Sequence, residues 1–433
     1  MDNQIEKKNI VKLLTIAKKE NIIGKIQQDI YYYNDEPRIP SFTVEIRYRS
    51  FSTYGFTMEK FRRYSSFSKE RCLLKTLGEA IERYSLNIYY KKDFLWDSYE
   101  NLKDKAINPK KFISFSESRI KPTFKIYNND REKLNWIKGF CFNDHKNIFI
   151  PAQFVYLPYK FEKGEPIINF SISTGAACYN SLKGAILTGL LEVIERDAFM
   201  VNYLNKFSRD IIDISKSKEE IFKKIIYQTE RYNLKLYILD ISTDVPVYSI
   251  LAILIDKTGL GPALSVGTKS DLNIRDCIIG AVEECFQVRP WIKGMMIKRG
   301  TKGIEKVKKN KDCLFEKVER GLLWSTTDMI KKIDFFLKGR KVPINNFHPV
   351  KTKNLDTLLS WFKKEKIEVF YVDVTPFNLR RKIFVVKVLV PQFQPLYLDE
   401  RFPSWAKERL REFPIKIGLK SLKNINKFPH PFL

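Results

Sequence analysis

Apolar residues recur at helical spacing in three stretches of the chain, and each stretch also carries acidic residues. The longest stretch covers residues 173–199 and opens with small residues that include Gly175. It continues as an apolar helical run through residues 185–194. Asn180 or Ser181 can act as the N-cap of this helix. The pattern therefore predicts a buried helix that begins near residue 181.

The same helix carries two carboxylates near its far end. Glu192 and Glu195 are three residues apart and emerge on one face, and Arg196 follows. A lone Glu-x-x-Glu pair is more often a solvated helix face. On so apolar a helix, however, two carboxylates repel each other and resist burial unless a cation or a proton compensates them.

The pattern occurs in two further stretches, CLLKTLGEAIERY (residues 72–84) and IIGAVEECFQVR (residues 278–289). Each has an acid, a second acid or amide three residues later, and an arginine. These residues are Glu79, Glu82, Arg83, Glu284, Gln287 and Arg289. Carboxylates that converge with arginines suit Mg²⁺ ions bridging a polyphosphate. The three helices therefore predict one nucleotide site that has no P-loop.

The segments GEAIERY, NSLKGAILTGLLEVIERDA and EECFQVR, in this order, resemble the YcaO family over roughly residues 45–400. The second motif is the most specific. The resemblance implies an α+β fold with mixed sheets, in which three Glu/Arg-bearing helices form one site for ATP and Mg²⁺. It implies that the metal ligands are Glu79, Glu82, Glu192 and Glu195. It implies that the nucleotide contacts are Arg83, Asn180, Ser181, Arg196, Glu284, Gln287 and Arg289.

The chain departs from the family pattern in the region that meets the phosphates. Family members often have glycines before the first Glu helix, and a serine where Lys75 stands. Lys75 or Lys69 could itself meet a phosphate, and the alternative is a solvated lysine. GLGPALSVGTKS resembles a P-loop, but Pro262 stands where the first loop glycine is required. We therefore expect a strand and a turn that lead into the third helix.

The chain ends in NKFPHPFL (residues 426–433), an extended Pro-x-Pro segment that cannot be helical. It could be a frayed terminus. Azoline-forming YcaO cyclodehydratases, however, commonly end in a Pro-x-Pro-x-Pro tail that enters the active site. Here Leu433 stands in place of the last proline. The resemblance thus gives Pro429, Pro431 and Leu433 catalytic roles.

The resemblance implies an ATP-dependent cyclodehydratase of ribosomally made peptides. A Cys, Ser or Thr side chain attacks the preceding backbone carbonyl, the oxyanion takes the γ-phosphoryl group of ATP, and loss of phosphate leaves a thiazoline or an oxazoline. The same chemistry with sulfide or an amine would give a thioamide or an amidine. A non-catalytic peptide-binding scaffold is the alternative from another class.

Composition adds a strong positive charge, with 77 Lys and Arg against 50 Asp and Glu, a net charge of +27. A polyanionic partner would suit this charge. Without an RNA-module signature or a long basic tract, we expect an acidic leader peptide or ATP, and no nucleic acid. The implied partners are a precursor peptide, a leader-binding protein (ubiquitin-activating-enzyme-like or a recognition-element protein), a flavin dehydrogenase and a second copy in a homodimer.

The cysteines and histidines exclude several kinds of site. Six cysteines stand singly and three histidines are far apart, which predicts reduced thiols, no zinc cluster and no histidine triad. Cys178 is expected to be a packed residue and not a nucleophile. The N-terminus lacks a signal-peptide core and no apolar run approaches a membrane span, so we expect a cytoplasmic protein without a membrane anchor.

Three regions are expected: an N-terminal extension (1–45), the YcaO catalytic domain (46–400) and a C-terminal segment with the Pro-rich tail (401–433). The extension should contain an amphipathic helix followed by a hairpin-like YYYNDEPRIPSF. Strands are expected at WIKGFCF, IFIPAQFVYL, LKLYILDI, VYSILAILID, IEVFYVDVT and IFVVKVLVP. The lysine-rich residues 302–311 should be an exposed loop or helix end.

Overall fold

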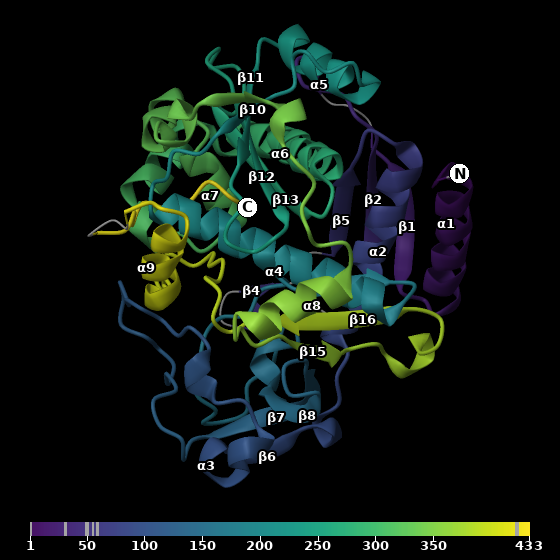
Figure 1. Cartoon of the computed structure of the whole chain (residues 1–433), viewed down its shortest axis with the longest axis vertical. Coiled ribbons are helices and arrows are strands. Elements are labelled where there is room, and N and C mark those ends of the chain that lie inside the picture. The colour runs from purple at the N-terminus through teal and green to yellow at the C-terminus, as the bar shows by residue number, and fades with distance from the viewer. Residues whose placement is uncertain (1, 30–32, 48–51, 54–55, 58–59, 421–423) are drawn as a thin grey trace.

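A computed structural model gives the arrangement of the chain (Figure 1). It describes residues 2–29, 33–47, 52–53, 56–57, 60–420 and 424–433. Tyr31 and Tyr32 of the expected hairpin lie outside the described residues, as does Gly55, the glycine that precedes the first Glu helix.

Polar caps set the starts of the three Glu-bearing helices. The side chains of Ser68, Ser181 and Asn273 accept hydrogen bonds from the first turns of α2, α4 and α6. Ser181 is thus the cap of the central helix, as predicted. The α-helices of the described chain are α1 (Asp2–Lys19), α2 (Lys69–Asn87), α3 (Tyr99–Leu102), α4 (Leu182–Leu204), α5 (Glu220–Arg231), α6 (Ile274–Lys309), α7 (Lys317–Leu323), α8 (Leu355–Lys364) and α9 (Lys407–Lys416).

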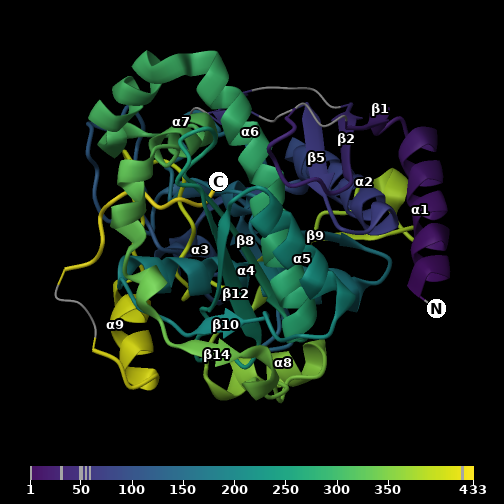
Figure 2. The same ribbon diagram turned by 90° about the horizontal axis from the view of Figure 1, so that it is seen from above.

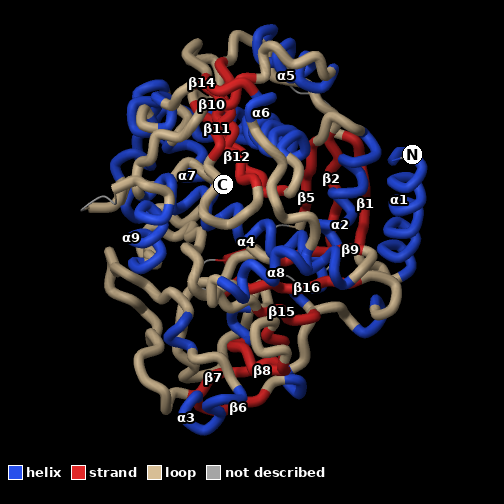
Figure 3. Tube along the Cα trace, viewed as in Figure 1, coloured by secondary structure: helices blue, strands red, loops and turns tan. Residues whose placement is uncertain are grey.

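The strands form three larger sheets, seen as three separate groups of strands in Figure 3. The first has the order β1 (Ile23–Gln28), β2 (Ser41–Ile46) and β5 (Phe61–Ser65). The second has the order β13 (Leu264–Asp271), β12 (Tyr248–Ile255), β11 (Lys235–Asp240), β10 (Ile211–Asp213) and β14 (Lys341–Pro343). The third has the order β6 (Leu95–Ser98), β7 (Lys133–Cys141), β15 (Phe370–Asp373), β16 (Phe384–Leu389) and β9 (Ala176–Tyr179).

Three short or peripheral strands complete the sheets. β8 (Lys146–Pro151) pairs with β7, and β3 (Ser52–Thr53) pairs with β4 (Phe56–Thr57). Only β10 and β14 run parallel among the described strand pairs, and the other ladders are antiparallel. The second sheet is therefore mixed and the first and third are antiparallel; together with the helices packed on them, they give the expected α+β class.

The central helix α4 joins the second and third sheets. It contacts β12 and β13 on one side and β9 and β16 on the other, and it crosses the middle of the molecule in Figure 1. The close approach to β16 depends on Gly189, where a Cβ atom would lie 2.9 Å from the Val388 side chain of that strand and 2.6 Å from the carbonyl oxygen of Gly175. α6 packs on β13 in a similar way at Gly267, where a Cβ would lie 2.3 Å from the Ala281 carbonyl oxygen. Both helices are thus fixed against the strands that lie beside the site.

One expected element differs from the structure, and the lysine-rich segment takes one of its two expected forms, a helix end. The strand expected at IFIPAQFVYL ends at Pro151 and continues as a 3₁₀ turn (Ala152–Phe154), since proline has no N–H to donate to the sheet. Residues 302–309 belong to the last turns of α6, which bends at Gly300 with φ 61° and ψ −176°. This bend is visible in the view from above (Figure 2).

The first 46 residues share a core with the rest of the molecule. α1 packs on α2, and β2 pairs with β5. The division at residue 45 stays a prediction. All six cysteines are free, as expected. Across the described ranges, the helices are too short or too polar to cross a membrane.

Candidate active site

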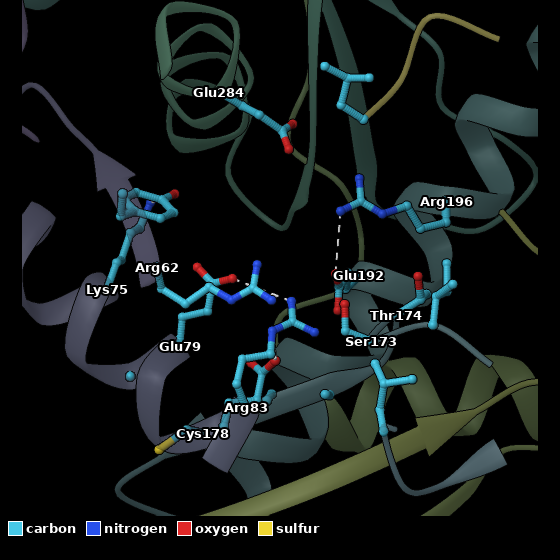
Figure 4. Close-up of a pocket in the computed structure, with 18 of the residues that line it drawn as sticks. Arg62, Lys75, Glu79, Arg83, Ser173, Thr174, Cys178, Glu192, Arg196 and Glu284 are labelled. Carbon is cyan, nitrogen blue, oxygen red and sulfur yellow. Dashed lines mark hydrogen bonds and ion pairs between the residues drawn. The ribbon is translucent and has the colours of Figure 1, made fainter. Parts of the chain in front are cut away.

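The three Glu-bearing helices face a single cavity of about 1390 Å³ (Figure 4). α2, α4 and α6 each place their acidic residues on its walls, as the helical spacing predicted. The expected site residues that line this cavity are Glu79, Glu82, Arg83, Asn180, Glu192, Glu195, Arg196, Glu284, Gln287 and Leu433.

On α4, the two carboxylates have different surroundings. Glu192 accepts a hydrogen bond from the Gly175 N–H (2.9 Å) and pairs with Arg196 at 3.4 Å. Glu195 is 3% exposed and accepts from the Thr268 hydroxyl (2.7 Å), the Ser270 N–H (3.1 Å) and Arg196 (2.7 Å). Glu192 is therefore open to a ligand, whereas Glu195 is already held by β13.

On α6, Glu284 accepts a hydrogen bond from the Thr268 N–H at 2.6 Å. Burial raises the pKa of Glu284 to about 7; Arg196 opposes this and Glu195 adds to it. Gln287 accepts from the Ser65 N–H (2.9 Å) and donates to the Arg63 carbonyl (3.0 Å). Its amide thus holds the edge of β5, so the polar residues of α6 both line the cavity and fix its wall.

The adjacent residue Glu283 has a supporting role that the sequence did not reveal. It is 1% exposed and accepts hydrogen bonds from the Ser66 hydroxyl (2.6 Å) and the Phe67 N–H (2.9 Å). These two residues immediately precede the cap of α2. Glu283 therefore sets the position of the first Glu helix relative to the third.

On α2, one arginine serves both carboxylates. Arg83 lies 3.4 Å from Glu79 and 3.6 Å from Glu82. Burial raises the pKa of Glu82 to about 8; Arg83 opposes the shift, and the charges of Glu192 and Glu79 add to it. Arg83 therefore compensates this carboxyl group only in part, and a bound divalent cation would supply the remaining positive charge.

The donor set fits Mg²⁺ together with a nucleotide. No group of three His, Cys, Asp or Glu side chains within the described ranges is arranged to hold an ion by itself. Mg²⁺, however, usually takes one or two carboxylates and completes its shell with water and substrate phosphates. Glu79, Glu82 and Glu192 offer carboxylate oxygens around the cavity, so the residues suit an ion that arrives with its polyphosphate.

Further positively charged residues face these carboxylates; besides Arg83 and Arg196, sequence reasoning considered only one of them, Lys75. Lys75 donates to the Tyr64 hydroxyl (2.7 Å) and lies 3.5 Å from Glu283, and burial lowers its pKa. Lys69, the other lysine considered, is not among the lining residues. The cations that were not predicted to line the cavity are Lys12, Lys60, Arg62, Arg63, Arg71, Lys269 and Lys317. Lys269 belongs to GTKS, so this segment contributes to the site although it is not a P-loop.

Four expected site residues do not line the cavity. Arg289 is 1% exposed and pairs with Glu36 and Asp256, so its guanidinium is fully engaged elsewhere. Ser181 caps α4, and the two tail prolines are buried behind the cavity wall. Helical spacing predicted Gln287 correctly as a lining residue, but it could not show that Arg289 points away from the cavity. The partners of Arg289, Glu36 and Asp256, are distant in the sequence.

Cys178 lines the cavity at the end of β9 (Figure 4). Burial raises the pKa of this thiol, and the charge of Glu82 raises it further. A thiol that resists ionisation is a poor nucleophile, which agrees with the expected packing role.

The C-terminal tail runs through the interior and reaches the cavity. The Tyr203 hydroxyl donates to the carbonyl oxygens of Phe428 and Pro429, both at 3.1 Å, and Arg320 donates to the His430 carbonyl at 2.9 Å. Phe432 is 2% exposed and its ring lies 4.2 Å from the guanidinium carbon of Arg196. Leu433 lines the cavity itself. The segment is thus ordered by specific contacts and is not a frayed end.

Residues 65–394, more than half of the chain, match the sequence model of a family described as "YcaO cyclodehydratase, ATP- and Mg²⁺-binding". The chain belongs to the YcaO family. This confirms the resemblance found in the motifs and the expectation of ATP and Mg²⁺ as cofactors. An uncharacterised protein of Methanothermobacter thermautotrophicus is 26% identical over 160 residues, which cover 37% of this chain and 42% of that protein.

Solved YcaO-type structures share the fold. A "heterocyclase in complex with substrate and cofactor" superposes with a TM-score of 0.77 at 19% identity, over 97% of this chain and 57% of the other. YcaO from Methanopyrus kandleri, bound with AMPPCP and Mg²⁺, gives a TM-score of 0.62 at 16% identity, over 92% and 94% of the two chains. The chain thus spans less than two thirds of the Methanothermobacter relative and of the heterocyclase.

Proposed function

We propose that this YcaO protein is an ATP-dependent cyclodehydratase that forms thiazoline or oxazoline rings in a ribosomally made peptide. The observation that carries the proposal is the buried tail, which ends at the same cavity as the carboxylates of α2 and α4. The tail is the feature that separates the azoline-forming subclass from its relatives in the family.

The chemistry needs an activated amide oxygen. The sulfur or oxygen of the attacking side chain forms a bond to the carbonyl carbon, its proton passes to a base, and the carbonyl π electrons move to the oxygen. That oxyanion takes the γ-phosphoryl group, and ADP leaves. The amide N–H proton is then lost, the C=N bond forms and phosphate departs, so the peptide loses one water in total.

The residues of the cavity match these needs. Glu79, Glu82 and Glu192 are our proposed Mg²⁺ ligands, and Glu195 would act with them or hold Arg196 in place. Bound Mg²⁺ would neutralise the negative charge that develops on the phosphoryl oxygens. Arg83, Arg196 and Lys75 would hold the phosphates, with Asn180, Glu284 and Gln287 lining the wall. Phosphoryl transfer requires little more than such positioning and charge neutralisation.

The tail would orient the attacking side chain. Proline fixes φ, so the 429–433 segment holds an extended shape at small entropic cost. Leu433 lines the cavity, so this segment would lie beside the attacking thiol or hydroxyl and restrict its orientation. Pro429 and Pro431 would then act through the tail's shape and not by contact with the substrate.

Co-expression with candidate Cys/Ser/Thr-rich precursor peptides, including any that neighbouring genes encode, tests the proposal. Mass spectrometry should show the peptide lighter by about 18 Da per ring, the mass of one water. Two residues added after Leu433 should abolish this loss and leave nucleotide binding intact. The conservative variant Tyr203→Phe, which removes two tail hydrogen bonds, should slow it. Full dehydration by the extended enzyme would reject the role of the tail.

Thioamide or amidine formation is the second candidate, because the ATP-binding cavity would serve it equally well. A peptide heavier by the oxygen-to-sulfur exchange would move the protein to that class. Peptide binding with neither peptide-dependent ADP release nor a change in peptide mass would instead favour a scaffold. We also propose that a leader-binding protein, and a flavin dehydrogenase that oxidises the rings, act with this chain.

A further inference from the structure

Lys387 is a buried lysine on β16 that the proposed function does not use. It is 2% exposed, and its ammonium donates to the carbonyl oxygens of Ile172 (2.5 Å) and Thr174 (2.7 Å). Burial lowers its pKa to about 7, although the nearby Glu192 opposes that shift. Burying an ammonium group costs free energy unless the group is hydrogen-bonded. The two carbonyl groups that Lys387 binds therefore show which part of the structure it stabilises.

Those partners belong to a short loop on the wall of the cavity. Ser173 and Thr174 line the cavity beside Glu192, across from Glu79 and Lys75 (Figure 4). The next residue, Gly175, donates its N–H to Glu192 at 2.9 Å. The loop therefore contacts one of the expected metal ligands directly.

The loop has no freedom to move away from this position. Gly175 has φ +85°, and a Cβ atom there would lie 2.2 Å from the Val388 carbonyl oxygen. The Gly175 carbonyl accepts from the Val388 N–H at 2.7 Å. Both Lys387 and Val388 lie on β16, so one strand fixes the loop at two successive residues.

Within the loop, the carbonyl acceptors are occupied, but the donors of Ser173 and Thr174 have no partner among the described residues. The carbonyl oxygens of residues 172–175 are all occupied, by Lys387, by the Ala176 N–H and by the Val388 N–H. By contrast, no described residue accepts a hydrogen bond from the N–H groups or hydroxyls of Ser173 and Thr174. These four donors belong to half-exposed residues on the cavity wall. Their acceptor must therefore come from a bound molecule or from water.

We propose that the Ser173–Thr174 loop binds the negatively charged oxygen that forms on the attacked peptide amide, and that Lys387 is the positioning residue that holds the loop in shape. By engaging two carbonyls from behind, Lys387 keeps acceptor oxygens away from the forming oxyanion. Donors fixed in advance at the place where charge develops lower a barrier more than donors that must reorganise. This inference rests on the proposed amide activation.

The test compares Lys387→Met with Lys387→Arg in the full chain, with a Cys/Ser/Thr-rich peptide that the wild-type protein modifies, or that stimulates its ADP release, as the probe. ADP release driven by the peptide gives kcat and KM, and calorimetry gives the nucleotide affinity without peptide. We expect Lys387→Met to lower kcat by up to about 100-fold, the loss that follows removal of one oxyanion donor, because the variant would displace the loop that carries the donors. Nucleotide affinity and the peptide KM should stay unchanged. The arginine variant, which can donate to both carbonyls, should recover at least part of the lost kcat.

Lys293→Met is the matched control. Lys293 is also a buried lysine with ion-pair partners, Asp35 and Glu36, but it does not line the cavity. This variant should lose stability and keep the kcat of the folded enzyme. If Lys387→Met does not fold, the double variant Ser173→Ala, Thr174→Val replaces it, because it removes two of the four donors and leaves the buried face untouched.

The possible outcomes distinguish a loop that binds the peptide oxyanion from a loop that binds the phosphates of ATP. An unchanged kcat in Lys387→Met, or in the double variant if that is used, overturns the proposal. Nucleotide affinity that weakens by the same factor as kcat also overturns it and places the loop at the phosphates of ATP. Product mass is read separately: wild-type ADP release without a loss of 18 Da rejects azoline formation, yet still allows the kcat comparison.

Discussion

At the scale of single residues, Glu192 and Glu195 look equivalent in the sequence but are held differently. Glu195 accepts hydrogen bonds from Thr268, Ser270 and Arg196, whereas the protein contacts of Glu192 are Gly175 and Arg196. A buried carboxylate with several donors contributes to stability as well as to any ligand site.

Glu192→Ala should therefore abolish Mg²⁺-dependent nucleotide binding with little change in stability. Glu195→Ala should also lose binding, and its free energy of unfolding should fall by about 2–3 kcal/mol because three buried donors lose a charged acceptor. Calorimetry and urea unfolding would separate the two effects. Unchanged nucleotide affinity in both variants would reject the metal assignment.

Arg289 was predicted to contact the nucleotide because an arginine suits a phosphate, but it does not line the cavity. Arg289→Met should leave Glu36 and Asp256 buried without their cation, which costs about 3–5 kcal/mol when a buried pair is broken. Nucleotide affinity measured at low temperature, where the variant is folded, should stay near the wild-type value. If Arg289→Met keeps normal stability but loses much of its nucleotide affinity, Arg289 is a nucleotide contact after all.

The sequence was informative about residues whose role follows from helical spacing. The i, i+3 carboxylates with a following arginine on apolar helices were enough to predict Glu79, Glu82, Glu192 and Arg196. It could not show that Lys269 and Arg62 face the same cavity, since they lie on strands whose neighbours are distant in sequence. Lys387 was hidden for a similar reason, because a lysine inside an apolar strand gives no sign of its acceptors.

At the scale of elements, the tail is held by polar contacts in an apolar surrounding. His430 is 1% exposed, and its Nε2 lies 2.7 Å from the Tyr397 carbonyl oxygen. Burial holds the pKa of His430 well below its usual value, and the positive charges of Arg320 and Arg196 lower it further. The imidazole is therefore neutral in the folded protein.

This predicts acid sensitivity of the tail. Below the unfolded-state pKa of about 6.5, His430 is protonated in the unfolded chain but stays neutral in the folded chain. The free energy of unfolding therefore falls as pH falls. At pH 5 the loss for one such group is at most about 2 kcal/mol. His430→Asn should show a smaller fall in melting temperature between pH 7 and pH 5 than the wild type. Equal falls in both proteins would contradict a neutral buried imidazole.

Elements were predictable where one local signal dominated. The cap at Ser181 and the apolar run after it fixed the start of α4, and β12 was evident as a continuous apolar strand. The strand expected at IFIPAQFVYL was too long because its apolar run continues past Pro151 into a 3₁₀ turn. The order of strands in the sheets could not be predicted, because strands that pair, such as β9 and β16, are far apart in the sequence.

At the scale of the whole molecule, the net charge of +27 is the dominant property. If it serves docking of an acidic leader or partner, the affinity for the precursor peptide should weaken several-fold between 50 and 300 mM NaCl. Nucleotide affinity, set by buried contacts, should change less over the same range. Calorimetry at both salt concentrations tests this, and a peptide affinity that does not vary would leave the lysines a solubility role only.

The way the cavity is assembled has a consequence for the lifetime of the protein. α2, α4 and α6 lie far apart in the sequence, so a nucleotide that touches all three acts as a reversible cross-link between distant parts of the chain. A ligand that binds only the folded form adds about 1.4 kcal/mol of stability for each tenfold rise above its dissociation constant. When ATP falls, the same chain should open more often and become a better substrate for proteases. Cellular energy would then set how long the enzyme survives, in addition to how fast it works.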